Sequence, residues 1–270
     1  VIEKHRCPGR DPGEKDEKSG RQDQPKEPGL AADVAAAPRA VRQVQRDLRS
    51  AAESGWDFSS RWLGDPAALT SIHTTDIVPI DLNSLLWAME RRIADRCAAL
   101  GDRACVTDFR QQADRRRKAI DRYLWLPTAA RFVDWDRSTG KPTSVLSAAT
   151  LFPLFVGLAT RQQADRVALT TRQSLIAIGG LRTTRLTTGQ QWDAPNGWAP
   201  LQWVAIDGLA RYGHDDLAHD IAGRWTETVT RTYRDTGKML EKYDVEERKA
   251  GGGGEYPTQD GFGWTNGVTA

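Results

Sequence analysis

"NSLLWAMERRIADRCAAL", residues 83–100, and "VTDFRQQADRRRKAIDRYLW", residues 106–125, carry the pattern of two consecutive amphipathic helices. In the first, Asn83 is the predicted N-cap and Gly101 the predicted end. Its predicted apolar stripe consists of Leu85, Leu86, Met89, Ile93, Cys97 and Leu100. In the second, Phe109, Ala113, Ile120 and Leu124 are expected to point inward. Its arginine-rich outer face is interpreted as a solvated helix surface rather than a binding site.

The same rhythm of helix, loop and helix continues along the chain. The spacing of Val41, Val44 and Leu48 indicates an early helix. Further helices are predicted over residues 145–159, 161–176, 199–213 and 215–233, separated by loops that carry Trp, Gly and Pro. Residues 141–159 are apolar nearly all round, which favours a helix enclosed by others. Strand signals are few, so the pattern predicts an all-α bundle or toroid with its chemistry in the loops.

Composition indicates a globular chain with no strong electrostatic preference. Its 270 residues are 39% hydrophobic and 27% charged, enough to bury one large core or two small ones. The net charge of +2 argues against nucleic acid or an anionic membrane as the main partner and favours a neutral small molecule. No apolar run approaches the roughly 18 residues of a membrane span. Residues 1–32 are expected to form a disordered tail, and residues 33–270 the folded part.

Cysteine and histidine spacings do not indicate a metal centre. Cys7, Cys97 and Cys105 contain no CxxC pair, which argues against a zinc knuckle but allows one bridge between Cys97 and Cys105. His214 and His219 are five residues apart, whereas ligands on one helical face are three or four apart. We therefore expect neither a metal nor a cofactor.

Three loop segments each combine an acidic residue with Gly and Trp. They are "ESGWDFSSRW" (53–62), "QWDAPNGWAP" (191–200) and "GGGGEYPTQDGFGWTNG" (251–267). Indole rings offer flat apolar faces to a pyranose ring, and carboxylates and amides match its hydroxyls. Any one of these tryptophans could simply pack in the core. The repetition in three segments favours a sugar-binding site.

A glycosidase needs two carboxyl groups, one protonated and one ionised. Asp57 lies between Trp56 and Phe58, and apolar neighbours raise the pKa of a carboxyl, as a general acid requires. For the second carboxyl, composition leaves four candidates open. They are Asp193, Glu241, Glu255 and Asp260.

Four segments together resemble the trehalases, glycosidases that split α,α-trehalose into two glucoses with inversion. "QWDAPNGWAP" is similar to their tryptophan-rich signature, and "GGGGEYPTQDGFGWTNG" to their glycine-rich segment. "ESGWDFSSRW" resembles the segment with the catalytic aspartate, and "MLEKYD" (239–244) the one with the catalytic glutamate. The matches follow the family's order over about residues 46–268, and the first 45 residues look unrelated.

The resemblance implies an (α/α)6 toroid, no cofactor, and trehalose as the substrate. It assigns Asp57 as general acid and Glu241 as general base. Gly55 and Glu255 would line the sugar pocket. The implied walls are Trp192, Trp198, Phe262 and Trp264. Asp193 and Asn196 would either bond sugar hydroxyls or fix their proline-containing loop through side-chain to backbone bonds.

The glycines at 251–254 resemble a phosphate cradle only superficially, because no helix opening with GK[ST] follows them. We interpret them as a flexible loop of the active site.

The sequence also departs from the family. The long N-terminal half of the trehalases, with an earlier signature rich in Gly, Arg, Tyr, Trp and Asp, has no match here. We therefore expect an incomplete toroid, and two alternatives stay open: an inactive fragment that at most binds sugar, and a helical interaction protein. The protein is expected to be a monomer, and the sequence allows either periplasm or cytoplasm.

Overall fold

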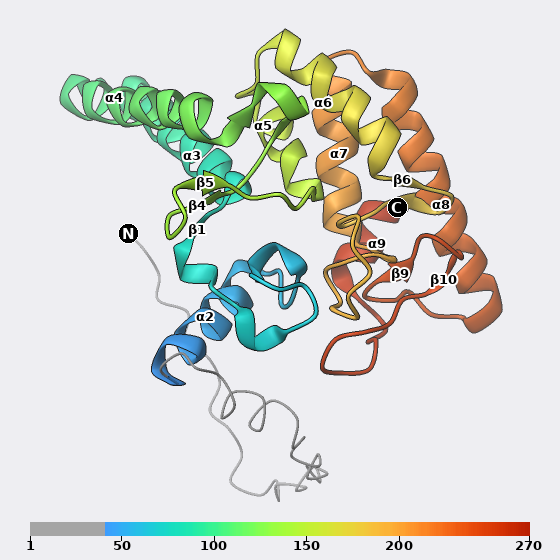
Figure 1. Ribbon diagram of the computed structural model, residues 1–270. Helices are drawn as coiled ribbons and strands as arrows, with labels where there is room; N and C mark the ends of the chain where they lie inside the picture. Colours follow the sequence, from blue (N-terminus) through green and yellow to red (C-terminus); the bar gives the residue numbers. More distant parts are fainter. Residues whose placement is uncertain (1–40) are drawn as a thin grey trace, which may run out of the picture.

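The computed structural model describes residues 41–270, so the expectation of a disordered tail over residues 1–32 lies outside the described residues. The described chain is mainly helical (Figure 1). Its helices are α2 (Val41–Ser54), α3 (Ile80–Ala99), α4 (Arg103–Ala119), α5 (Phe152–Phe155), α6 (Arg161–Ser174), α7 (Ala199–Arg211), α8 (Asp215–Thr236) and α9 (Gly263–Thr269).

The segments between the helices contain short strands, and each strand has two residues. They are β1 (Ile77–Val78), β2 (Trp125–Leu126), β3 (Arg131–Phe132), β4 (Trp135–Asp136), β5 (Lys141–Pro142), β6 (Ile176–Ala177), β7 (Gly180–Leu181), β8 (Asn196–Gly197), β9 (Tyr243–Asp244) and β10 (Lys249–Ala250). The pairings between these strands are antiparallel, in the orders β1-β4-β5, β10-β9-β8, β2-β3 and β6-β7. The pairing of β8 with β9 matters most for function, because it joins the segment "QWDAPNGWAP" to the segment "MLEKYD".

The helices α6, α7 and α8 follow the sequence pattern closely. They begin and end within a few residues of the predicted ranges and stand side by side in Figure 1. Thr160 and Gln163 form a capping box at the start of α6, so local sequence specifies where this helix begins. Burial of the apolar faces joins these helices to α2 and α5 in one hydrophobic core.

The helices α3 and α4 form the hairpin at the upper left of Figure 1. Gly101 turns the chain with a φ of +75°, and Asp102 caps α4 by accepting a hydrogen bond from the backbone N–H of Cys105 at 3.0 Å. Cys97 and Cys105 are bonded, with their Cα atoms 5.9 Å apart. The bridge that the sequence allowed is therefore present.

The predicted start and apolar stripe of α3 are wrong. The helix begins at Ile80, and Asn83 instead donates its side-chain amide to the carbonyl of Pro79. Of the expected stripe, Leu85, Met89 and Leu100 are exposed. The buried positions are Ile80, Asp81, Ser84, Glu90 and Ala94. On this face the carboxylates of Asp81 and Glu90 pair with Arg61 and Arg116, and helical periodicity does not report such pairs.

The long helix predicted over residues 145–159 is also wrong. This stretch forms a 3-10 turn, Ala148–Leu151, and the single turn of α5, which ends before Gly157 with its φ of +74°. The expected enclosure is confirmed, since Leu151, Leu154 and Leu158 are fully buried. The stretch packs closely against α7, since a Cβ on Gly208 would lie 2.9 Å from the backbone nitrogen of Phe155.

None of the helices within residues 41–270 has both the length and the apolar character that crossing a membrane would require.

Candidate active site

The structure brings the three loop segments together, as the sequence predicted. The backbone N–H of Trp192 donates to the carbonyl of Phe58 at 3.0 Å, and the side-chain amide of Gln191 donates to the carbonyl of Asp57. The N–H of Gly254 donates to the carbonyl of Gly189 at 3.1 Å. These bonds link segments that are more than sixty residues apart in the sequence, so they define one place on the molecule.

Asp193 holds the segment that carries Asp57. It is fully buried and accepts hydrogen bonds from the N–H of Ser60 at 2.8 Å and from the hydroxyls of Ser59 and Ser60 at 3.0 and 2.8 Å. The hydroxyls of Thr184 and Thr188 also donate to it. Burial raises the pKa of Asp193, although these hydrogen bonds act in the opposite direction. Its oxygens are thus occupied within the protein, which favours loop fixation over sugar binding.

Asn196 is used in the same way. Its amide nitrogen donates to the carbonyls of Gln191 at 3.1 Å and Gly252 at 2.6 Å, and its oxygen accepts the N–H of Gly252 at 3.2 Å. These bonds tie the tryptophan-rich loop to the glycine-rich one. They too favour the loop-fixing alternative for this residue.

Arg61 anchors the other end of the Asp57 segment. Its guanidinium is fully buried, bonds both oxygens of Asp81 at 2.7 Å, and reaches Asp134 at 2.6 and 2.8 Å. Burial opposes the charged guanidinium, but Asp134 and Asp81 outweigh it and raise the pKa of Arg61. The rings of Trp56 and Trp62 each lie 4.6 Å from its charged carbon. The guanidinium of Arg61, through its hydrogen bonds to two carboxylates, therefore holds the Asp57 segment against α3 and the loop before β4.

Asp57 is only partly buried, and burial is the main cause that raises the pKa of its carboxyl above the ordinary value of 3.8. The negative charge of Glu241 adds to this rise, while the charge of Lys242 and hydrogen bonding act against it. The predicted direction is confirmed. It also follows that Asp57 and Glu241, 184 positions apart by their numbers, lie close enough to interact electrostatically.

Glu241 lies just before β9 and is 3% exposed. Its N–H donates to the carbonyl of Gln259 at 2.9 Å, and its own carbonyl accepts the indole N–H of Trp264 at 2.9 Å. Its carboxylate accepts from the hydroxyl of Tyr256 at 2.9 Å and contacts the ammonium of Lys242 at 3.2 Å. Glu241 is thus a buried carboxylate with a fixed orientation.

The sequence analysis did not identify Gln191, Lys242 and Tyr256. Each is the immediate neighbour of a residue that it did single out, in "QWD", "EKY" and "GEY". Lys242 is fully buried, and a buried lysine is uncommon without a partner. The sequence alone gave no sign of that burial.

The expected aromatic walls differ in their exposure. Trp198 is 1% exposed and stacks on Trp192 with their ring centroids 3.9 Å apart and their planes within 2°. Trp264 meets Trp198 edge-on at 5.8 Å, and Phe262 lies 4.4 Å from Trp264. The burial and stacking of Trp198 favour a support for Trp192 over the wall that we expected. Phe262 and Trp264 are half-buried, so part of their surface remains accessible.

Gly55 and Glu255 are both exposed. Gly55 has a φ of +78°, which favours glycine at the turn just before Trp56. Glu255 is exposed and follows directly after the four glycines. Of those glycines, Gly251 is buried and donates its N–H to the carbonyl of Lys242 at 3.2 Å, so the loop is tied at its start.

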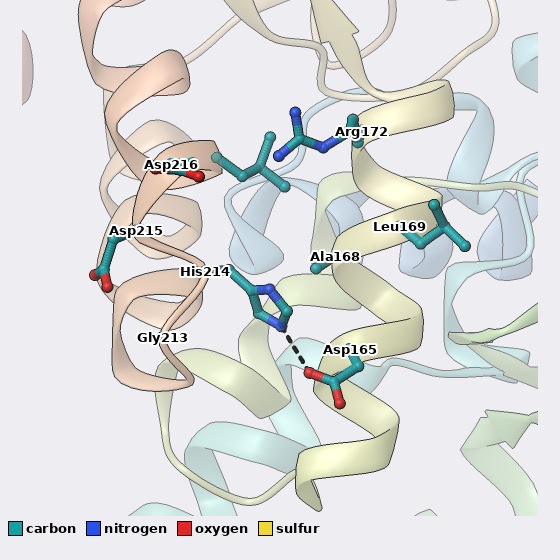
Figure 2. Close-up of a pocket in the computed structure, with 9 residues that line it drawn as sticks. Asp165, Ala168, Leu169, Arg172, Gly213, His214, Asp215 and Asp216 are labelled. Atoms are coloured by element: carbon teal, nitrogen blue, oxygen red, sulfur yellow. Dashed lines mark ion pairs between the residues drawn. The ribbon is translucent and has the colours of Figure 1, made fainter.

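A separate cavity of about 370 Å³ lies between α6 and the start of α8 (Figure 2). His214 points across it toward Asp165, with Nε2 and Oδ1 3.0 Å apart. None of the predicted site residues lines this cavity. Within residues 41–270, no group of three or more His, Cys, Asp or Glu side chains is arranged to hold a metal ion.

Comparison with known proteins identifies a family that this chain matches. A family model described as Trehalase matches residues 14–270. The match begins well upstream of residue 46, so our expectation that the first 45 residues are unrelated to the family is wrong for most of them. Four short motifs had defined that boundary, whereas the model also matches the sequence around and before them.

Individual relatives agree with this match. The periplasmic trehalase of Pseudomonas aeruginosa is 51% identical over 252 residues, which are 92% of this chain and 46% of that protein. The periplasmic trehalase of Salmonella agona is 49% identical over 252 residues, 44% of its length. This chain therefore spans about half the length of these curated relatives.

Two solved structures resemble the structure of this chain. The neutral trehalase of Saccharomyces cerevisiae has a TM-score of 0.71 and 30% identity, covering 85% of this chain and 42% of that one. A GH63 mannosylglycerate hydrolase from Thermus thermophilus has a TM-score of 0.60 and 20% identity, covering 72% of this chain and 45% of that one. The second likeness concerns the fold alone.

Proposed function

The chain belongs to the trehalase family, and on this premise we propose that it hydrolyses α,α-trehalose to two glucose molecules with inversion at one anomeric carbon. The observation that carries the proposal is the convergence of Asp57 and Glu241, one with a raised carboxyl pKa and the other oriented by two donors. A pair of carboxyls in different environments is what acid and base catalysis requires.

In the proposed reaction, the Asp57 carboxyl gives its proton to the glycosidic oxygen while the bond from that oxygen to the anomeric carbon breaks. Glu241 accepts a proton from a water molecule whose oxygen bonds to the opposite face of the same carbon. One glucose leaves with the proton of Asp57, and the other keeps the hydroxyl of the water. The two carboxyls should stand about 6.5–9.5 Å apart, since the water must fit between the base and the sugar.

The remaining residues would bind the substrate. Gly55 and Glu255 would line the sugar pocket, and the accessible parts of Phe262 and Trp264 would face a ring, with Trp192 behind them. Trp198 would support Trp192 from below, because the two rings are stacked. Asp193 and Asn196 would hold the loop. No cofactor takes part in these steps.

We further propose that residues 33–270 form the C-terminal part of an (α/α)6 glycosidase domain. The succession of the helices α6, α7 and α8, which share one hydrophobic core, supports this, as does the likeness to the yeast enzyme. The disulfide and the named periplasmic relatives favour the periplasm, an oxidising compartment, over the cytoplasm. The protein would act as a monomer.

The test is glucose release from trehalose, measured beside trehalose binding by calorimetry. If one of the two released glucoses first appears as the β-anomer and the other as the α-anomer, the whole proposal is supported. Binding without release would indicate the alternative of an inactive fragment that at most binds sugar. The absence of both binding and release would contradict the proposal and would favour a helical interaction protein.

A further inference from the structure

The carboxylate of Glu241 belongs to a buried polar cluster, defined here as Gln191, Lys242, Tyr256 and Glu241. The side chain of Lys242 has no exposed surface, and its ammonium lies 2.7 Å from Oε1 of Gln191 and 3.2 Å from Oε2 of Glu241. The rings of Trp198 and Tyr256 lie 5.4 and 4.9 Å from the ammonium. A buried ammonium requires a negative partner, and Glu241 is the carboxylate bonded to it.

Tyr256 holds the other oxygen of the same carboxylate. Its hydroxyl donates to Oε1 of Glu241 at 2.9 Å. Burial first, and then the charges of Glu241 and Asp57, raise the pKa of Tyr256 to about 12, although Gln191 opposes the rise. The hydroxyl therefore stays a donor throughout the working pH range. With one donor on each oxygen, the carboxylate keeps one lone pair on each for a water molecule.

Gln191 connects this cluster to the other carboxyl. Its Oε1 faces Lys242, which can only donate, and its Nε2 faces the backbone carbonyl of Asp57, which can only accept. The same nitrogen lies 3.3 Å from the hydroxyl of Tyr256. An amide, with a donor and an acceptor on one rigid plane, satisfies both neighbours. A carboxylate at this position would lose the bond to Asp57 and compete with Glu241 for Lys242.

We propose that Gln191, Lys242 and Tyr256 are positioning residues that pair with the Glu241 carboxylate, fix its orientation and fix its separation from Asp57. This inference rests on the proposed hydrolysis only for its kinetic consequences, because the contacts belong to the free protein. Lys242 supplies the charge, Tyr256 fixes the rotation of the carboxylate, and Gln191 ties the base-bearing segment to the acid-bearing one.

The variants that test the inference are Lys242→Met, Lys242→Arg and Gln191→Glu, with Lys249→Met as the control. Lys249 is a lysine whose side chain is 58% exposed on β10. The first readout is the pH profile of kcat/KM on trehalose. In Lys242→Met its acidic limb should move up by about one pH unit or more, because the opposite charge no longer favours the carboxylate. The value of kcat should fall by more than tenfold, and KM should change less.

Lys242→Arg restores the charge, so its acidic limb and its kcat should lie between those of Lys242→Met and the wild type. Gln191→Glu should reproduce the shift of the acidic limb without removing Lys242. Lys249→Met should behave like the wild type. Loss of activity in Lys242→Met with an unmoved limb and a lowered melting temperature would indicate a merely structural role and overturn the inference. If Lys242→Met does not fold, Gln191→Glu carries the same test.

A second readout does not depend on turnover. In protein labelled with ¹³C at the glutamate carboxyls, the Glu241 signal is assigned by its loss in Glu241→Gln. Its titration midpoint should lie at higher pH in Lys242→Met than in the wild type. If this shift occurs but the wild type releases no glucose, the proposed function fails and the inference stands. If glucose is released and neither readout moves, the inference fails alone.

Discussion

Ser60 and Asp193, 133 positions apart, are joined by two hydrogen bonds of 2.8 Å, one from the backbone N–H of Ser60 and one from its hydroxyl. This pair fixes the segment that bears the proposed acid to the tryptophan-rich loop. It does so without a contact to Asp57 itself. The position of the acid therefore depends on a buried carboxylate with a structural role.

Replacing Asp193 should thus reduce stability. In Asp193→Asn the new amide group would face hydroxyl and N–H donors, and buried donors would lose their acceptor. The free energy of unfolding should fall by about 2–4 kcal/mol, measured by chemical denaturation. Asp207→Asn, which breaks an exposed pair with Arg211 at 3.1 Å, should cost less than about 1 kcal/mol. Unchanged stability in Asp193→Asn with a higher KM for trehalose would instead assign Asp193 to sugar binding.

Arg61 should be still more sensitive. Arg61→Met leaves the carboxylates of Asp81 and Asp134 buried without their cation, so the free energy of unfolding should drop by about 3–5 kcal/mol. Arg61→Lys keeps the positive charge but not the planar set of guanidinium donors, so it should recover only part of the lost free energy of unfolding. The exposed Arg49, changed to Met, is the matched control with an expected cost below about 1 kcal/mol. Equal costs at the two positions would contradict the anchoring role.

The two proposed catalytic carboxyls should respond differently to the leaving group. Asp57→Asn should abolish turnover of trehalose, whose leaving sugar needs a proton. With α-glucosyl fluoride, which needs no such help, Asp57→Asn should retain more activity than Glu241→Gln, since only the second change removes the base that activates water. Initial rates of fluoride release measure this. Equal losses in both variants would refute the division of roles.

The raised pKa of Asp57 predicts a pH-dependent effect on stability. The folded protein keeps this proton to a higher pH than the unfolded chain, so the contribution is fully present below the ordinary value of 3.8 and is lost as the pH rises through the raised value. Asp57→Asn, which carries no charge, should therefore be more stable than the wild type at pH 7. The difference should shrink as the pH falls toward 3.8. A difference that stays constant between acidic and neutral pH would contradict the linkage.

The disulfide should contribute measurably to stability. Cys97 and Cys105 are eight positions apart, and closing so short a loop stabilises a fold by about 2–3 kcal/mol in the chain-entropy model. Adding a reductant should lower the free energy of unfolding of the wild type by this amount. The double variant with serine at both positions should start lower and not respond to the reductant. A response in the double variant would point to a different cause.

Local sequence determined several parts of this protein. The helical periods of α6, α7 and α8 and the capping box at Thr160 rest on contacts between residues a few positions apart, which local sequence encodes. The same holds for the turn at Gly101 that brings Cys97 to Cys105. The direction of the pKa shift of Asp57 was predicted from its apolar neighbours in the chain, Trp56 and Phe58, and burial is the main cause of that shift in the structure.

Tertiary structure decided the rest. The buried face of α3 is set by Arg61 and Arg116, which reach Asp81 and Glu90 from other elements. Likewise, Trp198 could serve as a wall or a support until packing placed it under Trp192. The contacts of Gln191 with Asp57 and Lys242 span 134 and 51 positions. Periodicity indicates which side chains face the core and which face the solvent. The partner of a buried charge is decided only when the loops close, because burial removes water from the charge and makes pairing necessary.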